Sequence, residues 1–233
     1  MKYNLKIGIK DGIPVALGYF AVSFTFGMAV VSEGFSVWHA VLISITNVTS
    51  AGQFAGLSII ASSGSYIEIA LTQLIINLRY CLMSFSLSQK LDRKTKTYHR
   101  FLMAFGVTDE IFALGVSCKG KLHPIYHYGI MAIAIPGWVL GTLVGGVFGN
   151  ILPAFIMSAL GIAIYGMFLA IILPPAKQDK SILYVVLAAM GISGLFAITP
   201  ILKEVSTGFV IIITTILVAG IAAKIRPIEE NVS

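Results

Sequence analysis

The stretch from Leu122 to Ala176 reads LHPIYHYGIMAIAIPGWVLGTLVGGVFGNILPAFIMSALGIAIYGMFLAIILPPA and contains no Asp, Glu, Lys or Arg. A helix needs about 20 mainly apolar residues to cross a bilayer, so this stretch is long enough for two crossings. Further charge-free stretches of membrane length cover residues 12–32, 34–67, 181–202 and 205–223. The pattern predicts an integral membrane protein.

The composition supports the same class. Of the 233 residues, 57% are apolar and 11% are charged, whereas an ordinary soluble domain is about 45–50% apolar and about 25% charged. These values exclude a soluble enzyme and a disordered chain. The formal net charge of +6 comes with no basic patch interleaved with exposed aromatic residues, so we expect no nucleic-acid partner.

The hydropathy pattern predicts an all-α polytopic fold in one transmembrane domain, residues 1–233, with about six to eight hydrophobic segments. The first is expected to be a retained helix, because its apolar run is too long for a cleaved signal peptide. The eight segments cover residues 12–31, 37–60, 66–88, 101–117, 126–148, 152–173, 181–200 and 205–223.

Basic residues gather between these segments, as the positive-inside rule requires. With the N-terminus in the cytoplasm, a full crossing by every segment would place the loop 88–100, which has five basic residues and one acidic residue, outside. If segments 37–60 and 101–117 are instead broken or re-entrant, all the basic loops fall inside. Such breaks are tolerated only where protein or a water-filled cavity satisfies the backbone. We therefore predict one or two broken or re-entrant segments.

Polar side chains in the segment 66–88 are candidates for function, because an ionisable group at the centre of a membrane helix costs about 2.5–3.5 kcal/mol. At 100° per residue, Glu68 and Arg79 fall on one helix face, and Asn77 lies roughly opposite. Arg79 can contact a substrate or a proton path, pair with Asp109 or Glu110, or extend to the interface. Glu68 is near the end of the segment, so an interfacial position is also open.

The adjacent carboxylates Asp109 and Glu110 form a second candidate cluster. Adjacent helical positions point about 100° apart, so the two carboxylates cannot easily share one partner. Close carboxylates in a low-dielectric site can take up and release a proton, as coupled transport requires. The alternative is an interfacial helix start with Thr108 as its N-cap and both acids in the first turn.

Small and polar residues from Thr46 to Gln53 form a third cluster. Ser50-Ala51-Gly52-Gln53 can unwind a helix, and the exposed carbonyls of such a break can hold a small zwitterion or a cation. Alternatively, these residues let helices pack closely, with hydroxyl groups bonding across the interface. We interpret the GxxxG pair of Gly141 and Gly145 as a packing motif.

Two proline-containing stretches resemble each other. Ile13-Pro14 followed by Leu17-Gly18 is similar to Ile135-Pro136 followed by Leu140-Gly141, at an offset of about 122 residues. Internal repeats build many transporters. Glycine and proline are also common in membrane helices, so chance explains the similarity equally well.

The sequence contains no HExxH, GxSxG, Walker or Rossmann pattern, and Cys81 and Cys118 have no metal-binding spacing. We therefore expect no catalytic activity, no metal and no cofactor. The polar residues within membrane segments favour a transporter over an enzyme or a structural subunit.

The same residues resemble the AzlC family, the larger subunit of branched-chain amino acid exporters. One departure is Asn150-Ile151, where the family pattern leads us to expect a Leu-Asp pair, so an acidic contribution is missing. The matching pieces are Gly12-Ile13-Pro14 with Gly18-Tyr19, Ser50-Ala51-Gly52-Gln53-Phe54, Asn77-Leu78-Arg79-Tyr80 with Leu82-Met83, Thr108 to Leu114, and Leu152-Pro153-Ala154-Phe155.

The resemblance implies a multi-pass protein of the bacterial inner membrane that exports leucine, isoleucine and valine, with methionine as a further candidate. It also implies coupling to the proton motive force and a small multispan partner of the AzlD type. The alternative is a secondary transporter or channel for another small solute. The candidate substrate-binding or proton-coupling residues are Arg79, Asp109, Glu110, Asn77, Gln53, Gly52, Ser50 and Glu68.

Overall fold

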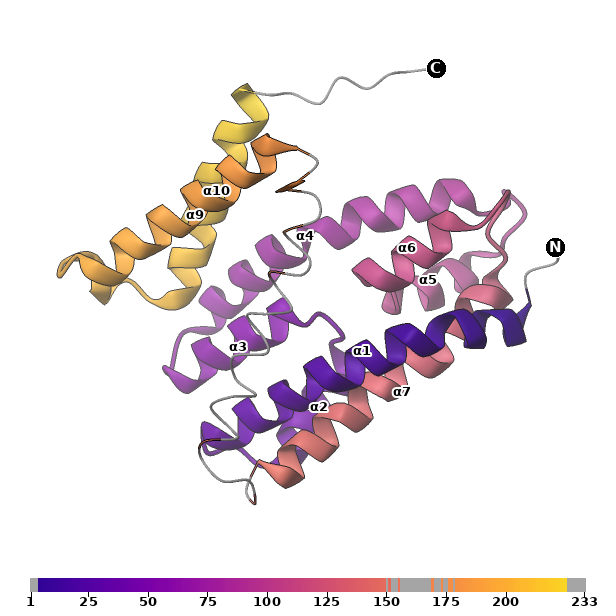
Figure 1. The fold of residues 1–233 in the computed structure, drawn as a ribbon, viewed down its shortest axis with the longest axis horizontal. Helices are drawn as coiled ribbons and strands as arrows, with labels where there is room; N and C mark the ends of the chain where they lie inside the picture. The colour runs from indigo at the N-terminus through magenta and orange to yellow at the C-terminus, as the bar shows by residue number, and fades with distance from the viewer. Residues whose placement is uncertain are drawn as a thin grey trace. The chain divides into compact units, whose positions relative to one another are not determined.

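The long helices α1 (Leu5–Ser32) and α7 (Pro124–Phe148) lie side by side along their length in a computed structural model (Figure 1). The structure describes residues 4–149 and 179–225, and between these ranges residues 151, 155, 169, 173, 176 and 177. The described regular elements are all helical, and five of the helices are long and apolar enough to cross a membrane. The all-α membrane fold predicted from the sequence is confirmed.

The contacts within the chain define two compact units. The first comprises Met1–Gln53 with Asn77–Ile164, and the second comprises Phe54–Ile76 with Tyr165–Ser233. The predicted segment 152–173 and the helix end at Pro174-Pro175 lie outside the described residues, as does Asn150.

Close packing of α1 against α7 forms the centre of the first unit. A Cβ added at Gly145 would collide with the Phe24 carbonyl, and one added at Gly141 would collide with the Phe20 carbonyl. These glycines therefore let two helix backbones approach closely, as the GxxxG pair predicts. Near the other end of the pair, Gly8 lies against the Tyr126 carbonyl. The two helices therefore run parallel and begin on the same side.

The two similar proline-containing stretches lie in this parallel pair. Pro14 is inside α1 and Pro136 is inside α7. Ala16 faces Gly137, and Phe20 faces Gly141. The similar residues therefore lie near one another in the pair rather than at separate places in the fold.

The segment predicted over 101–117 is broken. It forms α5 (Thr97–Phe105) and α6 (Asp109–Ser117), and each helix of 9 residues is about 14 Å long, about half of the hydrocarbon thickness. A backbone bridge joins Leu91, before α5, to Leu122, after α6, with the Leu122 amide donating to the Lys90 carbonyl at 2.9 Å. Because these flanking loops touch, the segment enters and leaves on one side of the membrane.

The segment predicted over 37–60 is also broken. Helix α2 (Val37–Thr46) ends at Asn47, and α3 (Ala51–Ala61) begins after Ser50, whose φ of 49° lies in the left-handed region. The prediction that Ala51, Gly52 and Gln53 unwind is wrong in position, since these residues form the first turn of α3. The unwound residues lie on the N-terminal side, at 47–50.

Helix α4 (Tyr66–Lys90) leads from the second unit into the first. With 25 residues it is about 37 Å long, enough to cross the hydrocarbon core. Helix α1 is also long enough. The broken α2–α3 segment therefore lies between two helices that are each long and apolar enough to cross a membrane.

The second unit contains α9 (Lys180–Ile198), the short helix η1 (Leu202–Glu204) and α10 (Thr207–Ile225). Helices α9 and α10 form a hairpin (Figure 1). The Glu68 side chain is 4% exposed, and its carboxylate accepts hydrogen bonds from the Ser206 hydroxyl and, at 3.1 Å, from the Gly208 amide. Glu68 therefore caps the N-terminus of α10, where negative charge is favourable, and its side chain is buried in the protein.

We predict that Gly145→Ala destabilises the protein by about 1–3 kcal/mol, because the added methyl group overlaps the Phe24 carbonyl. Thermal unfolding of the full chain in detergent measures the change. Gly191→Ala in α9 is the matched control, since its Cβ would meet no atom within 4 Å. An unchanged melting temperature for Gly145→Ala would show that the α1–α7 contact is looser than described.

The same-side loops generate a second prediction. After Cys81 and Cys118 are replaced by Ser, single cysteines at Lys94 and Lys119 should react with an impermeant maleimide from the same side of the membrane. A cysteine at Glu33, after α1, should react from the opposite side. Comparing labelling in intact cells with labelling in inverted vesicles shows which side of the membrane each cysteine faces. If positions 94 and 119 were labelled from opposite sides, the re-entrant arrangement of α5 and α6 would be contradicted.

Candidate functional site

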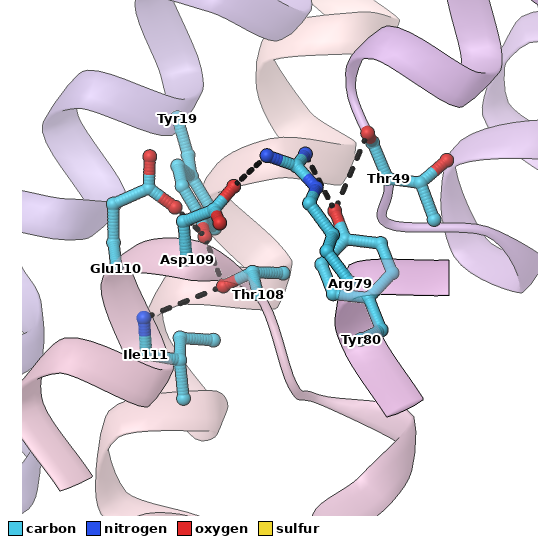
Figure 2. A network of polar contacts seen from close by, with 8 residues as sticks. All are labelled: Tyr19, Thr49, Arg79, Tyr80, Thr108, Asp109, Glu110 and Ile111. Carbon is cyan, nitrogen blue, oxygen red and sulfur yellow. Dashed lines mark hydrogen bonds and ion pairs between the residues drawn. The ribbon is translucent and has the colours of Figure 1, made fainter. Parts of the chain in front are cut away.

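An ion pair joins α4 to the first turn of α6 (Figure 2). Arg79 Nη1 lies 2.8 Å from Asp109 Oδ2, and the two side chains are 42% and 34% exposed. The guanidinium also stacks over the Tyr80 ring, 5.1 Å from its centroid, and its Nη2 donates to the Tyr80 hydroxyl at 3.3 Å. Of the two acids considered as ion-pair partners of Arg79, Asp109 is the one that pairs with it.

Glu110 is held by a different partner, Tyr19 of α1. The Tyr19 hydroxyl donates to Glu110 Oε2 at 2.7 Å and also bonds to the Thr108 hydroxyl. A tyrosine hydroxyl has one proton, so Thr108 must be the donor in the second bond. The result is a directed chain from Thr108 through Tyr19 to Glu110, visible on the left of Figure 2.

The helix start predicted at Thr108 is confirmed. Thr108 is the N-cap of α6, its hydroxyl oxygen accepts the Ile111 amide at 3.4 Å, and both acids lie in the first turn. The two carboxylates bind different partners, Arg79 and Tyr19, as the 100° between adjacent helical positions requires. The N-cap and a role of the acids in transport are therefore compatible.

The break between α2 and α3 adjoins this network. The Tyr80 hydroxyl donates to the Thr49 carbonyl at 3.5 Å, which links Arg79 through Tyr80 to the unwound residues (Figure 2). The hydroxyl oxygens of Thr49 and Ser50 are buried and have no hydrogen-bond partner among the described residues. Because a buried polar atom normally has a partner, these hydroxyls are available to bind a substrate group or water.

A buried polar cluster supports the other side of the break. Gln53 Nε2 donates to the Ser44 hydroxyl at 3.0 Å, and Ser44 bonds to the Thr142 hydroxyl of α7 at 2.7 Å. Gln53 Oε1 is buried and has no partner within the described part of the chain. These bonds fix the α2–α3 break against the close-packed α1–α7 pair.

The structure brings together only some of the residues predicted from the sequence. Arg79, Asp109 and Glu110 meet in one network in the first unit. Ser50 lies in the adjoining break, and Gly52 and Gln53 follow in the first turn of α3.

Two predicted residues are placed differently. Asn77 is two positions before Arg79 on α4, so its side chain leaves a different face of the helix. Glu68 belongs to the second unit, where it caps α10. Their predicted roles in substrate binding or proton coupling stay predictions.

Sequence reasoning missed Tyr19, Tyr80, Ser44 and Thr142 as members of these networks. A single tyrosine or hydroxyl residue in an apolar helix gives no signal of its own, because its partner is distant in the chain. Tyr19 and Glu110, for example, are separated by 91 positions.

The arrangement provides both signs of charge beside a broken helix. Arg79 can bind an anionic group, and Asp109, Glu110 and the carbonyls of the break can bind a cationic one. An ionisable residue at membrane depth usually marks a substrate or ion path, and broken helices are typical of transporter sites. These features are typical of a polytopic membrane transport protein.

The chain belongs to the AzlC family, whose model, described as AzlC protein, matches residues 14–152. The chain is similar to the inner membrane protein YgaZ of Escherichia coli (strain K12), with 29% identity over 183 residues, covering 75% of this chain and 74% of the relative. An uncharacterized membrane protein of Archaeoglobus fulgidus is 33% identical over 172 residues, covering 73% of this chain and 75% of the relative.

A more distant relative carries a functional name. The branched-chain amino acid transport protein AzlC of Bacillus subtilis (strain 168) is 21% identical over 162 residues, covering 66% of this chain and 63% of the relative. No solved structure matches the chain. The family and its relatives support a role in membrane transport and confirm the resemblance noted from the sequence.

We predict that Arg79 and Asp109 are energetically coupled. Arg79→Gln and Asp109→Asn should each lower the free energy of unfolding, because each leaves one charge without its partner. The double variant should lose less than the sum of the two single losses. Denaturant unfolding of the full chain in micelles, followed by circular dichroism, measures the coupling. Glu33→Gln with Lys96→Gln is the distant control pair, and strict additivity at Arg79 and Asp109 would show that the ion pair does not form.

Proposed function

We propose that this chain is the larger subunit of an exporter of branched-chain amino acids, acting as one transport domain in the plasma membrane. The observation that carries the proposal is the Arg79–Asp109 ion pair, which stands beside the α2–α3 break and is partly exposed. A charged pair at membrane depth is costly unless it has a function or a protein environment. The name of the Bacillus subtilis relative supports branched-chain amino acids as the substrate class.

An amino acid carries one carboxylate and one ammonium group, and the site can bind both. The substrate carboxylate would exchange with Asp109 on the Arg79 guanidinium, whose fork of N–H groups suits a carboxylate. The released Asp109, together with Glu110 or the Thr49 carbonyl, would then bind the ammonium group. The hydroxyls of Thr49 and Ser50, which bond to none of the described residues, would provide further polar contacts.

Glu110 is our proposed carrier of the coupling proton. Its carboxylate ends the hydrogen-bond chain from Thr108 through Tyr19, so the protonated and ionised forms both have an oriented partner. Proton binding to Glu110 would change its bond to Tyr19 and, through Thr108, the start of α6. In this way proton uptake and substrate binding act on the same helix turn.

Selectivity among aliphatic side chains should be limited. One methylene group in an apolar pocket is worth about 1–3 kcal/mol. Leucine, isoleucine and valine should therefore compete for export, with methionine as a further candidate. We also propose a cytoplasmic N-terminus and a small multispan partner of the AzlD type, following the family resemblance.

Efflux from cells loaded with a leucine-containing dipeptide tests the function. Cells with this chain and its partner should lower internal leucine faster than cells without them. Arg79→Ala and Asp109→Asn should reduce efflux at least about tenfold, because each loss of about 1.4 kcal/mol in binding is tenfold, while the protein stays in the membrane. Lys203→Gln in η1, outside the proposed site, should transport normally.

Equal leucine efflux with and without the chain would contradict the exporter. Export of an unrelated solute, and not of leucine, in a substrate panel would favour a transporter or channel for that solute. Normal efflux from Arg79→Ala and Asp109→Asn would remove both residues from the site.

A further inference from the structure

An apolar groove runs between α5 and α7 in the first unit. It has a volume of about 540 Å³, and its walls are almost entirely apolar. Phe101, on its rim, is 74% exposed. The lining residues are Phe101, Leu102 and Phe105 from α5, and Tyr128 and Met131 from α7.

The groove has a polar end and an apolar end. At the end nearer the loops, His99 Nδ1 bonds to the Tyr128 hydroxyl at 2.7 Å. Further along α5, Gly106 packs against Met131. The polar His99–Tyr128 contact and the apolar lining are therefore separated along one short helix, about 14 Å long for 9 residues. This length is close to that of one bilayer leaflet's hydrocarbon layer.

A strongly basic surface borders the polar end. Helix α5 begins directly after the loop 91–96, and α7 begins directly after the loop 118–123. The Leu91–Leu122 bridge holds these loops together. Residues 88–100 and 118–123 contain seven basic residues and one acidic residue, a net charge of +6, which equals the formal net charge of the whole chain. The basic excess of the protein is thus concentrated in the loops that lead into α5 and α7, the two helices that form the groove.

We propose that the α5–α7 groove binds one anionic phospholipid. The acyl chain lies along Phe101 and Phe105, and the phosphate faces the exposed cations of the loop 91–96. An acyl chain needs an apolar groove that starts at the membrane surface, and a phosphate needs nearby cations. Arg93, Lys94 and Lys96 supply those cations in the loop that leads directly into α5.

Charge complementarity favours an anionic lipid over a neutral one. Clusters of four to eight Lys and Arg residues at the end of a membrane helix are typical of anionic-lipid sites. Phosphatidylcholine would fill the groove equally well, but its choline group would lie among cations. A soluble phosphate compound would meet the cations but leave the groove empty.

Native mass spectrometry of the purified full chain tests the preference. The protein is mixed with equal amounts of phosphatidylglycerol and phosphatidylcholine that have identical acyl chains. Phosphatidylglycerol adducts should exceed phosphatidylcholine adducts by at least about fivefold, since each nearby cation contributes about 1 kcal/mol. Glycerophosphoglycerol, which has the headgroup without acyl chains, should give no adduct at the same concentration.

Two triple variants separate this site from a general charge effect. Arg93→Gln with Lys94→Gln and Lys96→Gln should remove the preference. The matched control, Lys180→Gln with Lys203→Gln and Lys224→Gln, removes three charges from the second unit and should keep it. Circular dichroism and gel filtration confirm that both variants are folded.

Photo-crosslinking locates the lipid independently. Phosphatidylglycerol with a diazirine on its acyl chain should label peptides that cover residues 97–106 and 124–132. Equal adducts of the two lipids, loss of the preference in the control variant, or crosslinks confined to other helices would each overturn the proposal. If glycerophosphoglycerol bound as well as phosphatidylglycerol, the cations would instead form a binding site for a soluble anion.

Discussion

Backbone groups freed where a helix breaks cannot stay unpaired in a membrane, and the first unit is organised around meeting this requirement at two breaks. At the second break, the Thr108 hydroxyl caps α6 by accepting the Ile111 amide. At the first break, the Tyr80 hydroxyl donates to the Thr49 carbonyl. The cap at Thr108 is local to α6, whereas Tyr80 belongs to the neighbouring helix α4, so the first break depends on the folded unit for its partner. The close α1–α7 packing supplies the rigid support on which Tyr19 is fixed.

The charged residues depend on the same arrangement. Asp109 reaches Arg79, and Glu110 reaches Tyr19, only because α6 starts at Thr108 and so directs both acids outward from its first turn. One capping bond therefore positions two carboxylates for different partners. The proposed transport site uses both: Asp109 exchanges with the substrate carboxylate, and Glu110 carries the proton. In this proposal the two carboxylates act through the same helix turn.

The charges outside the site have a different role. The basic loops that flank the α5–α6 segment lie together because Leu91 bridges to Leu122. This bridge makes the segment re-entrant and gathers the basic excess on one surface. By the positive-inside rule we expect this surface to face the cytoplasm. The helix α5, which begins at this surface, lines the apolar groove that we propose for a lipid. Our expectations for orientation and for lipid binding thus both rest on the backbone contact between Leu91 and Leu122.

The sequence by itself determined the class of the fold and the short list of charged candidates, because long charge-free stretches and charged residues within apolar segments are visible in the order of the residues. It also predicted both broken segments, since a basic loop between full crossings would lie on the wrong side. It could not place the first break at 47–50, because the left-handed backbone at Ser50 is not encoded in local propensity. Only the tertiary structure decided that Arg79 pairs with Asp109, that Tyr19 holds Glu110 and that Glu68 caps α10. These choices depend on which distant helices touch, and local sequence carries no record of such contacts.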